Sequence, residues 1–257
     1  MSTSLEIGIL GLPNVGKTTL FNALTKAGVE TNNCLYSTIE PNLGMVDVPD
    51  ERLTKLAEMY KPKKITPTSI RFVDIAGLGK GASTGAGLGN KFLSHIRQVD
   101  AVVQVVRCFS DENVMHVEGR INPTNDMDIL NTELCLADLE SLEKRLERTK
   151  KLLKGGDKKP LVEIELLKRL IELLGDAQPA RKASLTSDEM DLIRDMNLLT
   201  LKPVLYVANI DENDAADATG GPMFKAVQEW AAAEGAEAIA VSAKLEAEIS
   251  ELIYVMF

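Results

Sequence analysis

The stretch that decides the fold is "LEIGILGLPNVGKTTLFNAL", residues 5–24. Residues 5–10 form a short apolar run typical of a buried strand, and apolar side chains recur at helical spacing in residues 17–24. Between them stands Gly-x-x-x-x-Gly-Lys-Thr, residues 11–18, the phosphate-loop pattern in the strand–loop–helix context that it requires. Its glycines let backbone N–H groups face phosphate oxygens, and the helix N-terminus adds a partial positive charge. The stretch therefore predicts a phosphate site between a strand and a helix.

The polar residues of this loop have distinct expected roles. Lys17 reaches the β- and γ-phosphates and is a candidate catalytic residue, whereas the Thr18 hydroxyl ligates Mg²⁺. The predicted nucleotide contacts of the loop are Asn14, Val15, Gly16, Lys17, Thr18 and Thr19.

A second magnesium anchor is predicted in "SIRFVDIAGLGKG", residues 69–81. Asp74 ends a predicted strand and would hold Mg²⁺ through water, and Gly77 follows at Asp-x-x-Gly spacing. The Gly77 N–H is expected to meet the γ-phosphate, a second catalytic role. Thr38, in "NNCLYSTIEPNLG" (residues 32–44), is expected to cap the metal as a switch threonine, with an ordinary loop threonine as the alternative.

The residue after Gly77 departs from the pattern of small GTPases. They carry a glutamine there that orients the attacking water, whereas this chain has Leu78, which cannot hydrogen-bond water. A slow intrinsic turnover is therefore expected. His95 and His116 are interpreted as packed or exposed side chains, and neither is predicted to be catalytic.

A helical insertion is predicted between two apolar strands, one at residues 101–109 and one just before Asn209. Apolar residues at three-four spacing on either side of a glycine-rich turn at 155–160 predict an antiparallel helical hairpin. The seam residues are Leu139, Leu142, Leu146 and Leu153, then Ile164, Leu167, Ile171 and Leu174. The expected division is a nucleotide domain at 1–127 and 201–257, with the hairpin at 128–200.

Basic residues gather around the hairpin turn, although the whole chain has a net charge of −9. The net charge argues against a protein that coats nucleic acid generally. A basic tip is, however, a plausible contact for RNA phosphates, with a solvated helix end as the alternative. The candidate RNA contacts are Lys150, Lys151, Lys154 and Lys158.

The stretch "NIDE", residues 209–212, replaces the guanine reader Asn-Lys-x-Asp. Guanine presents two donors to the aspartate carboxylate, and Glu212 is one methylene too long for that geometry. Adenine presents an acceptor, which a carboxylate would repel, so Glu212 suits neither base. Its expected role is to reject guanine, or its side chain points elsewhere. Asn209 is expected to hold the purine edge. The remaining predicted base contacts are Ile210, Ser242, Ala243 and Lys244.

The composition and the N-terminal sequence bear on where the protein is located. Its 257 residues are 45% hydrophobic, with no apolar run as long as a membrane span and no signal peptide at the N-terminus. Its three cysteines are scattered and lack metal-binding spacing. We therefore expect a cytoplasmic protein with no membrane partner. A monomer is also expected.

The motifs together resemble the YchF family, the Obg-like ATPases. The resemblance rests on "GLPNVGKTTLFNALTKAGVE", "FVDIAGLGKGAS", "RCFSDENVMHVEGR", "KPVLYVAN" and "SAKLEAE". It implies an α/β fold, namely a Ras-like P-loop NTPase domain with a mostly parallel central sheet flanked by helices, plus the inserted hairpin. It also implies ATP preferred over GTP, Mg²⁺, and binding to the ribosome or a ribosomal subunit. The family carries a C-terminal TGS domain, which this chain is expected to lack.

The resemblance also bears on the missing glutamine. Family members have a hydrophobic residue in its place, which matches Leu78. In some related enzymes an asparagine at the position of Asn14 helps to bind potassium, so K⁺ is a second candidate cofactor. Two other functions stay open: a GTPase with relaxed base recognition, and an ATP-dependent binding module with negligible hydrolysis.

Overall fold

The structure is a computed structural model that describes residues 5–26, 41–75, 77–78, 81, 88–152, 159–217 and 219–255. Its described strands form one sheet in the order β2-β3-β1-β4-β5-β6. Only β2 is antiparallel to its neighbour, β3, and the other pairings are parallel. The strand bounds are β1 Leu5–Leu10, β2 Asn42–Asp47, β3 Ser69–Asp74, β4 Ala101–Cys108, β5 Val204–Ile210 and β6 Glu237–Val241. The expected α/β class with a mostly parallel sheet is confirmed.

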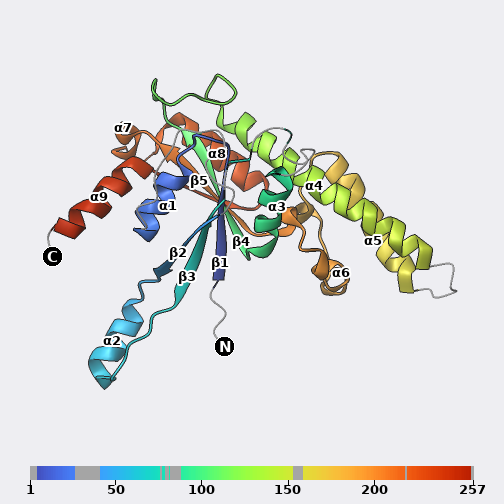
Figure 1. Ribbon diagram of the computed structural model, residues 1–257, viewed down its shortest axis with the longest axis horizontal. Helices are drawn as coiled ribbons and strands as arrows, with labels where there is room; N and C mark the ends of the chain where they lie inside the picture. Colours follow the sequence, from blue (N-terminus) through green and yellow to red (C-terminus); the bar gives the residue numbers. More distant parts are fainter. Residues whose placement is uncertain are drawn as a thin grey trace.

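Helices cover both faces of this sheet (Figure 1). The alternation of side chains along β4 shows why: Val103 and Val105 pack toward α1 (Lys17–Thr25) and α9 (Ala243–Val255). Val102 packs on the other face, with α3 (Leu88–Gln98) and the start of α4 (Pro123–Leu152). Near the end of the strand, Val106 packs against α8 (Gly221–Ala233) on that same face. Both faces of β4 are therefore buried, as its continuous apolar sequence predicts.

The helices α4 and α5 (Lys159–Gly175) form an antiparallel pair. Near the sheet, Asn131 Nδ2 donates to the Ala177 carbonyl oxygen at 2.9 Å. Toward the far end, Arg145 Nε donates to Glu163 Oε1 at 2.6 Å. Six predicted seam residues lie in or against the shared apolar cluster, namely Leu139, Leu142, Leu146, Leu167, Ile171 and Leu174. Ile164 is buried but lies outside that cluster, and the turn between the helices, with Leu153, lies outside the described residues.

The helix α4 also shapes the boundary between the two expected domains. It begins at Pro123, and Met127, Leu130 and Leu134 are buried against the sheet and its helices. The boundary expected at residue 128 therefore falls inside one continuous helix. The division into a nucleotide domain and an insertion stays an interpretation of the sequence.

The segment that returns to β5 is made of short helices. A capping box of Thr186 and Glu189 begins α6 (Ser187–Ile193), as the sequence predicts. Three 3₁₀ turns complete the segment, at Ala180–Lys182, Arg194–Met196 and Leu199–Leu201. The last of them is anchored by the buried Asp138 of α4, which accepts hydrogen bonds from the Leu199 and Thr200 N–H groups.

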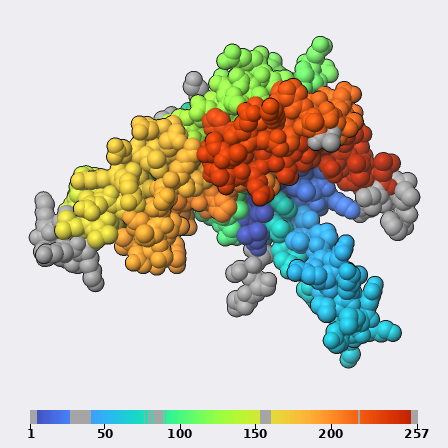
Figure 2. Space-filling model, turned by 180° about the vertical axis from the view of Figure 1, so that it is seen from behind, coloured from blue at the N-terminus to red at the C-terminus, as the bar shows by residue number. Residues whose placement is uncertain are grey.

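An arm extends the β2–β3 ribbon away from the sheet (Figures 1 and 2). It contains α2 (Glu51–Tyr60), which begins after the cap residue Asp50. The remaining helix is α7 (Glu212–Ala215), which follows β5. Among the described helices, none is long and apolar enough to cross a membrane.

Candidate nucleotide site

The phosphate loop joins β1 to α1 at the carboxyl edge of the sheet. Gly16 adopts a left-handed backbone conformation with φ of 95°, and α1 begins at the next residue, Lys17. Lys17 is buried, and its Nζ donates to the Leu12 carbonyl oxygen at 2.7 Å. Burial lowers the pKa of Lys17 to about 8, while the nearby Asp74 acts in the opposite direction. The loop thus holds a poorly solvated ammonium group that a phosphate would stabilise.

Thr18 and Asp74, two of the predicted magnesium anchors, meet at the end of β3. Thr18 Oγ1 donates to Asp74 Oδ2 at 3.0 Å, and Asn42 Nδ2 lies 3.4 Å from the same oxygen. Burial raises the pKa of Asp74, although the Thr18 bond and Lys17 oppose that shift. Asp74 Oδ1 is buried without a hydrogen-bond partner. A hard cation suits this oxygen-rich corner, because it would satisfy a carboxylate that the protein leaves half unpaired.

Gly77 and Leu78 lie directly against the phosphate loop. A Cβ on Gly77 would come within 2.9 Å of the Pro13 backbone nitrogen, so the approach requires glycine. The Leu78 N–H donates to the Gly11 carbonyl oxygen at 3.2 Å. The Leu78 side chain is fully buried in an apolar cluster that includes Phe92. Thr38, the other predicted magnesium ligand, lies outside the described residues.

A pocket of about 360 Å³ opens beside the loop. It brings together eight residues predicted to contact the nucleotide: Gly16, Thr19, Asn209, Ile210, Glu212, Ser242, Ala243 and Lys244. Four further residues line it without having been predicted: Phe109, Ser110, Asp111 and Asp211. Asn14 and Val15 do not line this pocket and belong to the phosphate loop beside it.

Asn209 joins three parts of the site. Its Nδ2 donates to the Val15 carbonyl oxygen at 2.9 Å, and its Oδ1 accepts from the Ala243 N–H at 3.0 Å. The side chain is buried, and a Cβ on Gly16 would come within 2.2 Å of Nδ2. Asn209 therefore ties the phosphate loop to the loop after β6, a positioning role beyond the purine contact expected from the sequence.

The rim of the pocket carries an ion pair. Glu212, the first residue of α7, pairs with the Lys244 ammonium group. This partner raises the pKa of Lys244. Ile210 contributes to the pocket wall, but it is buried in the apolar cluster below. No lysine stem covers the base at that position, in contrast to the guanine reader.

The loop after β4 lies in the stretch "RCFSDENVMHVEGR" that carries the family resemblance, but its residues were not predicted to contact the nucleotide. The strand register provides the signal: Arg107 of β4 pairs with Asn209 of β5, so the two strands end side by side. The Arg107 side chain is buried over the Phe109 ring at 4.5 Å, and Arg107 donates to the Phe109 and Asp111 carbonyl oxygens. These contacts fix the loop at the wall of the pocket.

The same loop contacts the phosphate loop and α4. Asn14 Nδ2 donates to the Met115 carbonyl oxygen at 3.1 Å. The neighbouring His116 is buried, with Nε2 2.9 Å from Asp126 Oδ2 and with Nδ1 accepting from the Glu118 N–H. His116 is therefore a packed side chain that connects this loop to the first turn of α4.

Two of the predicted RNA contacts lie at the far end of α4. Lys150 and Lys151 are exposed on its last turn, and Lys150 pairs with Glu147 at 2.8 Å. Lys154 and Lys158 lie outside the described residues.

Comparison with known proteins identifies the family. Residues 6–162 match the family described as "50S ribosome-binding GTPase". The chain is 53% identical to the ribosome-binding ATPase YchF of Bacillus subtilis, over 97% of this chain and 68% of that protein. It is 49% identical to the YchF of Escherichia coli O157:H7, over 96% of this chain and 67% of that protein.

A solved structure supports the same assignment. The Schizosaccharomyces pombe YchF GTPase is 39% identical to this chain and superposes with a TM-score of 0.80. The match covers 98% of this chain and 68% of that one. This chain belongs to the YchF family.

Proposed function

We propose that this chain hydrolyses ATP in preference to GTP with the help of Mg²⁺, and that its nucleotide state controls binding to the ribosome or a ribosomal subunit. The observation that carries the hydrolase proposal is the convergence of Lys17, Thr18 and Asp74 at the end of β3. The names of the relatives, ribosome-binding ATPases, support both the reaction and the partner.

The roles of the phosphate-site residues follow from their positions. Lys17 would exchange the Leu12 carbonyl oxygen for β- and γ-phosphate oxygens. Thr18 directly, Asp74 through water and Thr38 would hold Mg²⁺, which supplies positive charge to the phosphates when bound. Gly77 lies against Pro13 of the loop, a position that supports the proposed contact of its N–H with the γ-phosphate.

The base pocket supports adenine over guanine. A guanine reader needs a free carboxylate to accept from two donors on the base, and Glu212 is instead paired with Lys244. Asn209, Ile210 and the backbone of Ser242–Lys244 would hold the purine. A GTPase with relaxed base recognition is the second candidate, since Glu212 still occupies the slot of the guanine-reading aspartate.

Without a switch glutamine, the water must be positioned by another group. Leu78 is packed into the core and cannot reach it. We therefore expect slow turnover, and propose K⁺ beside the phosphates as an aid, with Asn14 Oδ1 as a ligand. Equal turnover in sodium and potassium buffers would contradict the potassium proposal.

Two contacts offer a route from the nucleotide to the hairpin. The Gly81 N–H, in the glycine-rich segment after Gly77, donates to Glu133 Oε1 of α4 at 2.6 Å. The Asn14 contact with Met115 connects the phosphate loop to the loop held by Asp126 of α4. A change at the γ-phosphate would thus reach α4, whose far end carries the predicted RNA contacts, including Lys154 and Lys158. Ribosome binding would place the protein in the cytoplasm.

The test of the proposed reaction is ATP turnover in the Lys17→Ala variant. We expect turnover to be lost, because the γ-phosphate loses its charged partner. Unchanged turnover would contradict the assignment of the phosphate site.

A further inference from the structure

The arm between β2 and β3 is not used by the nucleotide site. Residues 48–50 lead out to α2, and residues 61–68 return along it to β3. Figure 2 shows the arm standing clear of the body of the molecule. No residue of α2 is buried, and Leu56, Met59 and Tyr60 are exposed. A helix with so little packing suggests a surface that meets a partner.

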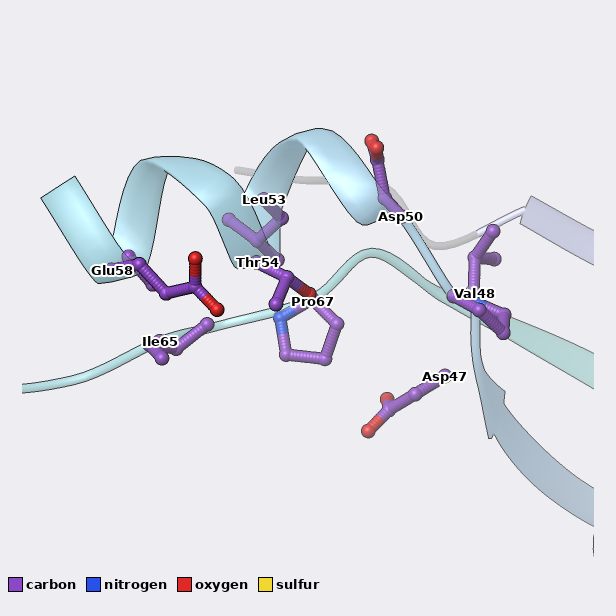
Figure 3. Close-up of a pocket in the computed structure, with 10 residues that line it drawn as sticks. Asp47, Val48, Asp50, Leu53, Thr54, Glu58, Ile65 and Pro67 are labelled. Carbon is purple, nitrogen blue, oxygen red and sulfur yellow. The ribbon is translucent and has the colours of Figure 1, made fainter.

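The inner part of the arm does not suit an anion. A hollow of about 520 Å³ lies between α2 and the returning segment (Figure 3). Leu53, Ile65 and Pro67 give it an apolar wall, but Asp47 and Glu58 also line it. The carboxylates would repel phosphate groups, so an RNA contact is not expected in the hollow.

The outer end of the arm has the opposite character. We define the arm tip as Tyr60, Lys61, Lys63 and Lys64, which lie close together at and after the end of α2. All four are exposed, and Tyr60 is 76% exposed. Within the described part of the chain, none of the three lysines forms an ion pair or a side-chain hydrogen bond. What distinguishes these cations from other exposed lysines is that they lie close together, on a chain with a net charge of −9.

We propose that the arm tip is an RNA-binding surface, with the lysines on backbone phosphates and the Tyr60 ring stacked on a base. Lysines that release counterions provide affinity, and an aromatic ring offers a stacking face that accepts any base. RNA is favoured over a protein partner because lysine is depleted in protein interfaces. The exposed apolar residues of α2 make a protein the alternative for the test to exclude.

The paired strands β2 and β3 connect the arm to the predicted magnesium site at Asp74. The register of β2 and β3 runs from Asp47↔Ser69, at the arm, to Asn42↔Asp74, at the predicted magnesium site. RNA bound at the arm tip would thus contact a segment that continues into the two strands that lead to Asp74. The RNA-binding surface adds to the proposed function and rests on it, because the ribosome of that proposal would supply the RNA. It adds a second contact, on a projection separate from the hairpin (Figure 1).

The test is binding of a fluorescein-labelled, 12-nucleotide single-stranded RNA over a range of salt concentrations. The triple variant Lys61→Gln, Lys63→Gln, Lys64→Gln is compared with a control of equal charge, Lys91→Gln, Lys168→Gln, Lys225→Gln, taken from exposed lysines elsewhere. We expect the arm variant to bind roughly tenfold more weakly at low salt, and the slope of log K against log salt to fall by about 2. ATP affinity should equal that of the control.

Tyr60 is tested separately. Tyr60→Ala should weaken RNA binding by about fivefold or more, and Tyr60→Phe should retain it, because the phenylalanine ring still stacks. Equal RNA affinity and salt slope in the arm and control triples would overturn the inference.

Purified ribosomal subunits separate this inference from the proposed function. If the arm variant loses subunit binding but not RNA binding, the arm meets a protein and the inference is wrong. If the wild-type chain binds RNA through the arm but does not bind subunits, the inference stands and the proposed ribosome contact fails.

Discussion

Glu212 and Lys244 form an ion pair at the rim of the base pocket. Their side chains are 42% and 70% exposed, so the pair contributes little to stability. In the structure the pair directs the Glu212 carboxylate toward the loop after β6. The guanine-reading slot therefore contains a carboxylate that already has a partner.

Shortening this carboxylate should change base preference. Glu212→Asp cannot easily reach Lys244 and restores the length of the guanine reader, so GTP affinity should rise more than ATP affinity falls. We expect the ratio of the two dissociation constants to move by roughly ten- to a hundredfold, measured by titration calorimetry with Mg²⁺. Glu246→Asp, the same change on an exposed residue outside the pocket, is the control. An unchanged ratio would show that Glu212 does not discriminate between the bases. The backbone of the Ser242–Lys244 loop would then be the better candidate.

The burial of Lys17 predicts a pH-dependent stability difference. The folded-state pKa of about 8 is below the ordinary value of 10.5, so the charged form destabilises the nucleotide-free fold. Lys17→Met should therefore raise the free energy of unfolding at pH 7 by roughly 1–3 kcal/mol. The wild-type penalty is fully present below pH 8 and disappears as pH rises from 8 toward 10.5, so the difference should shrink across that range. Denaturant unfolding at several pH values measures it, and a constant difference would contradict the account.

The Asn209 tie predicts an unusual cost for a small substitution. Gly16→Ala places a Cβ 2.2 Å from Asn209 Nδ2, which should break the tie and abolish nucleotide binding. Gly235→Ala is a matched control, because Gly235 also has a positive φ, of 68°, but open space around it. Both variants carry the strain of alanine at positive φ, about 1–2 kcal/mol. Only the first should lose ATP affinity, and equal losses would show that strain alone is responsible.

The far end of the hairpin predicts a salt-dependent ribosome contact. Changing Lys150, Lys151, Lys154 and Lys158 to Glu should weaken binding to ribosomal subunits and flatten its salt dependence. ATP affinity should remain, because the end of α4 lies far from the phosphate loop in Figure 1. Reversing four other exposed lysines, Lys91, Lys168, Lys182 and Lys225, controls for net charge. If the hairpin variant binds subunits as tightly as the wild-type chain, the basic cluster is a solvated helix end and not an RNA contact.

Much of the fold could be predicted from the sequence, because its signals are local. The phosphate loop needs a strand before it and a helix after it, and both are present. Buried strands such as β4 and β5 appear as continuous apolar runs, and the capping box at Thr186 marks the start of α6. The three-four spacing of leucines, which is also a local pattern, predicts the paired helices α4 and α5.

The remaining features depend on contacts between distant parts of the chain. The Asn209 tie links residues that are 194 positions apart, so no local pattern contains it. The loop at Phe109–Asp111 lies in a stretch that carries the family resemblance, but nothing local indicates a nucleotide contact, and the register of β4 and β5 brings the loop to the pocket. The beginning of α4 at Pro123 was not anticipated, because the first part of that helix is buried on the sheet and lacks a simple seam.

The most direct test of the central proposal is side-by-side titration of the wild-type chain with ATP and with GTP in the presence of Mg²⁺. The geometry of Glu212, Lys244 and Asn209 predicts that ATP binds more tightly, by roughly tenfold or more. GTP binding as tightly as ATP, or more tightly, would contradict the account and favour a GTPase.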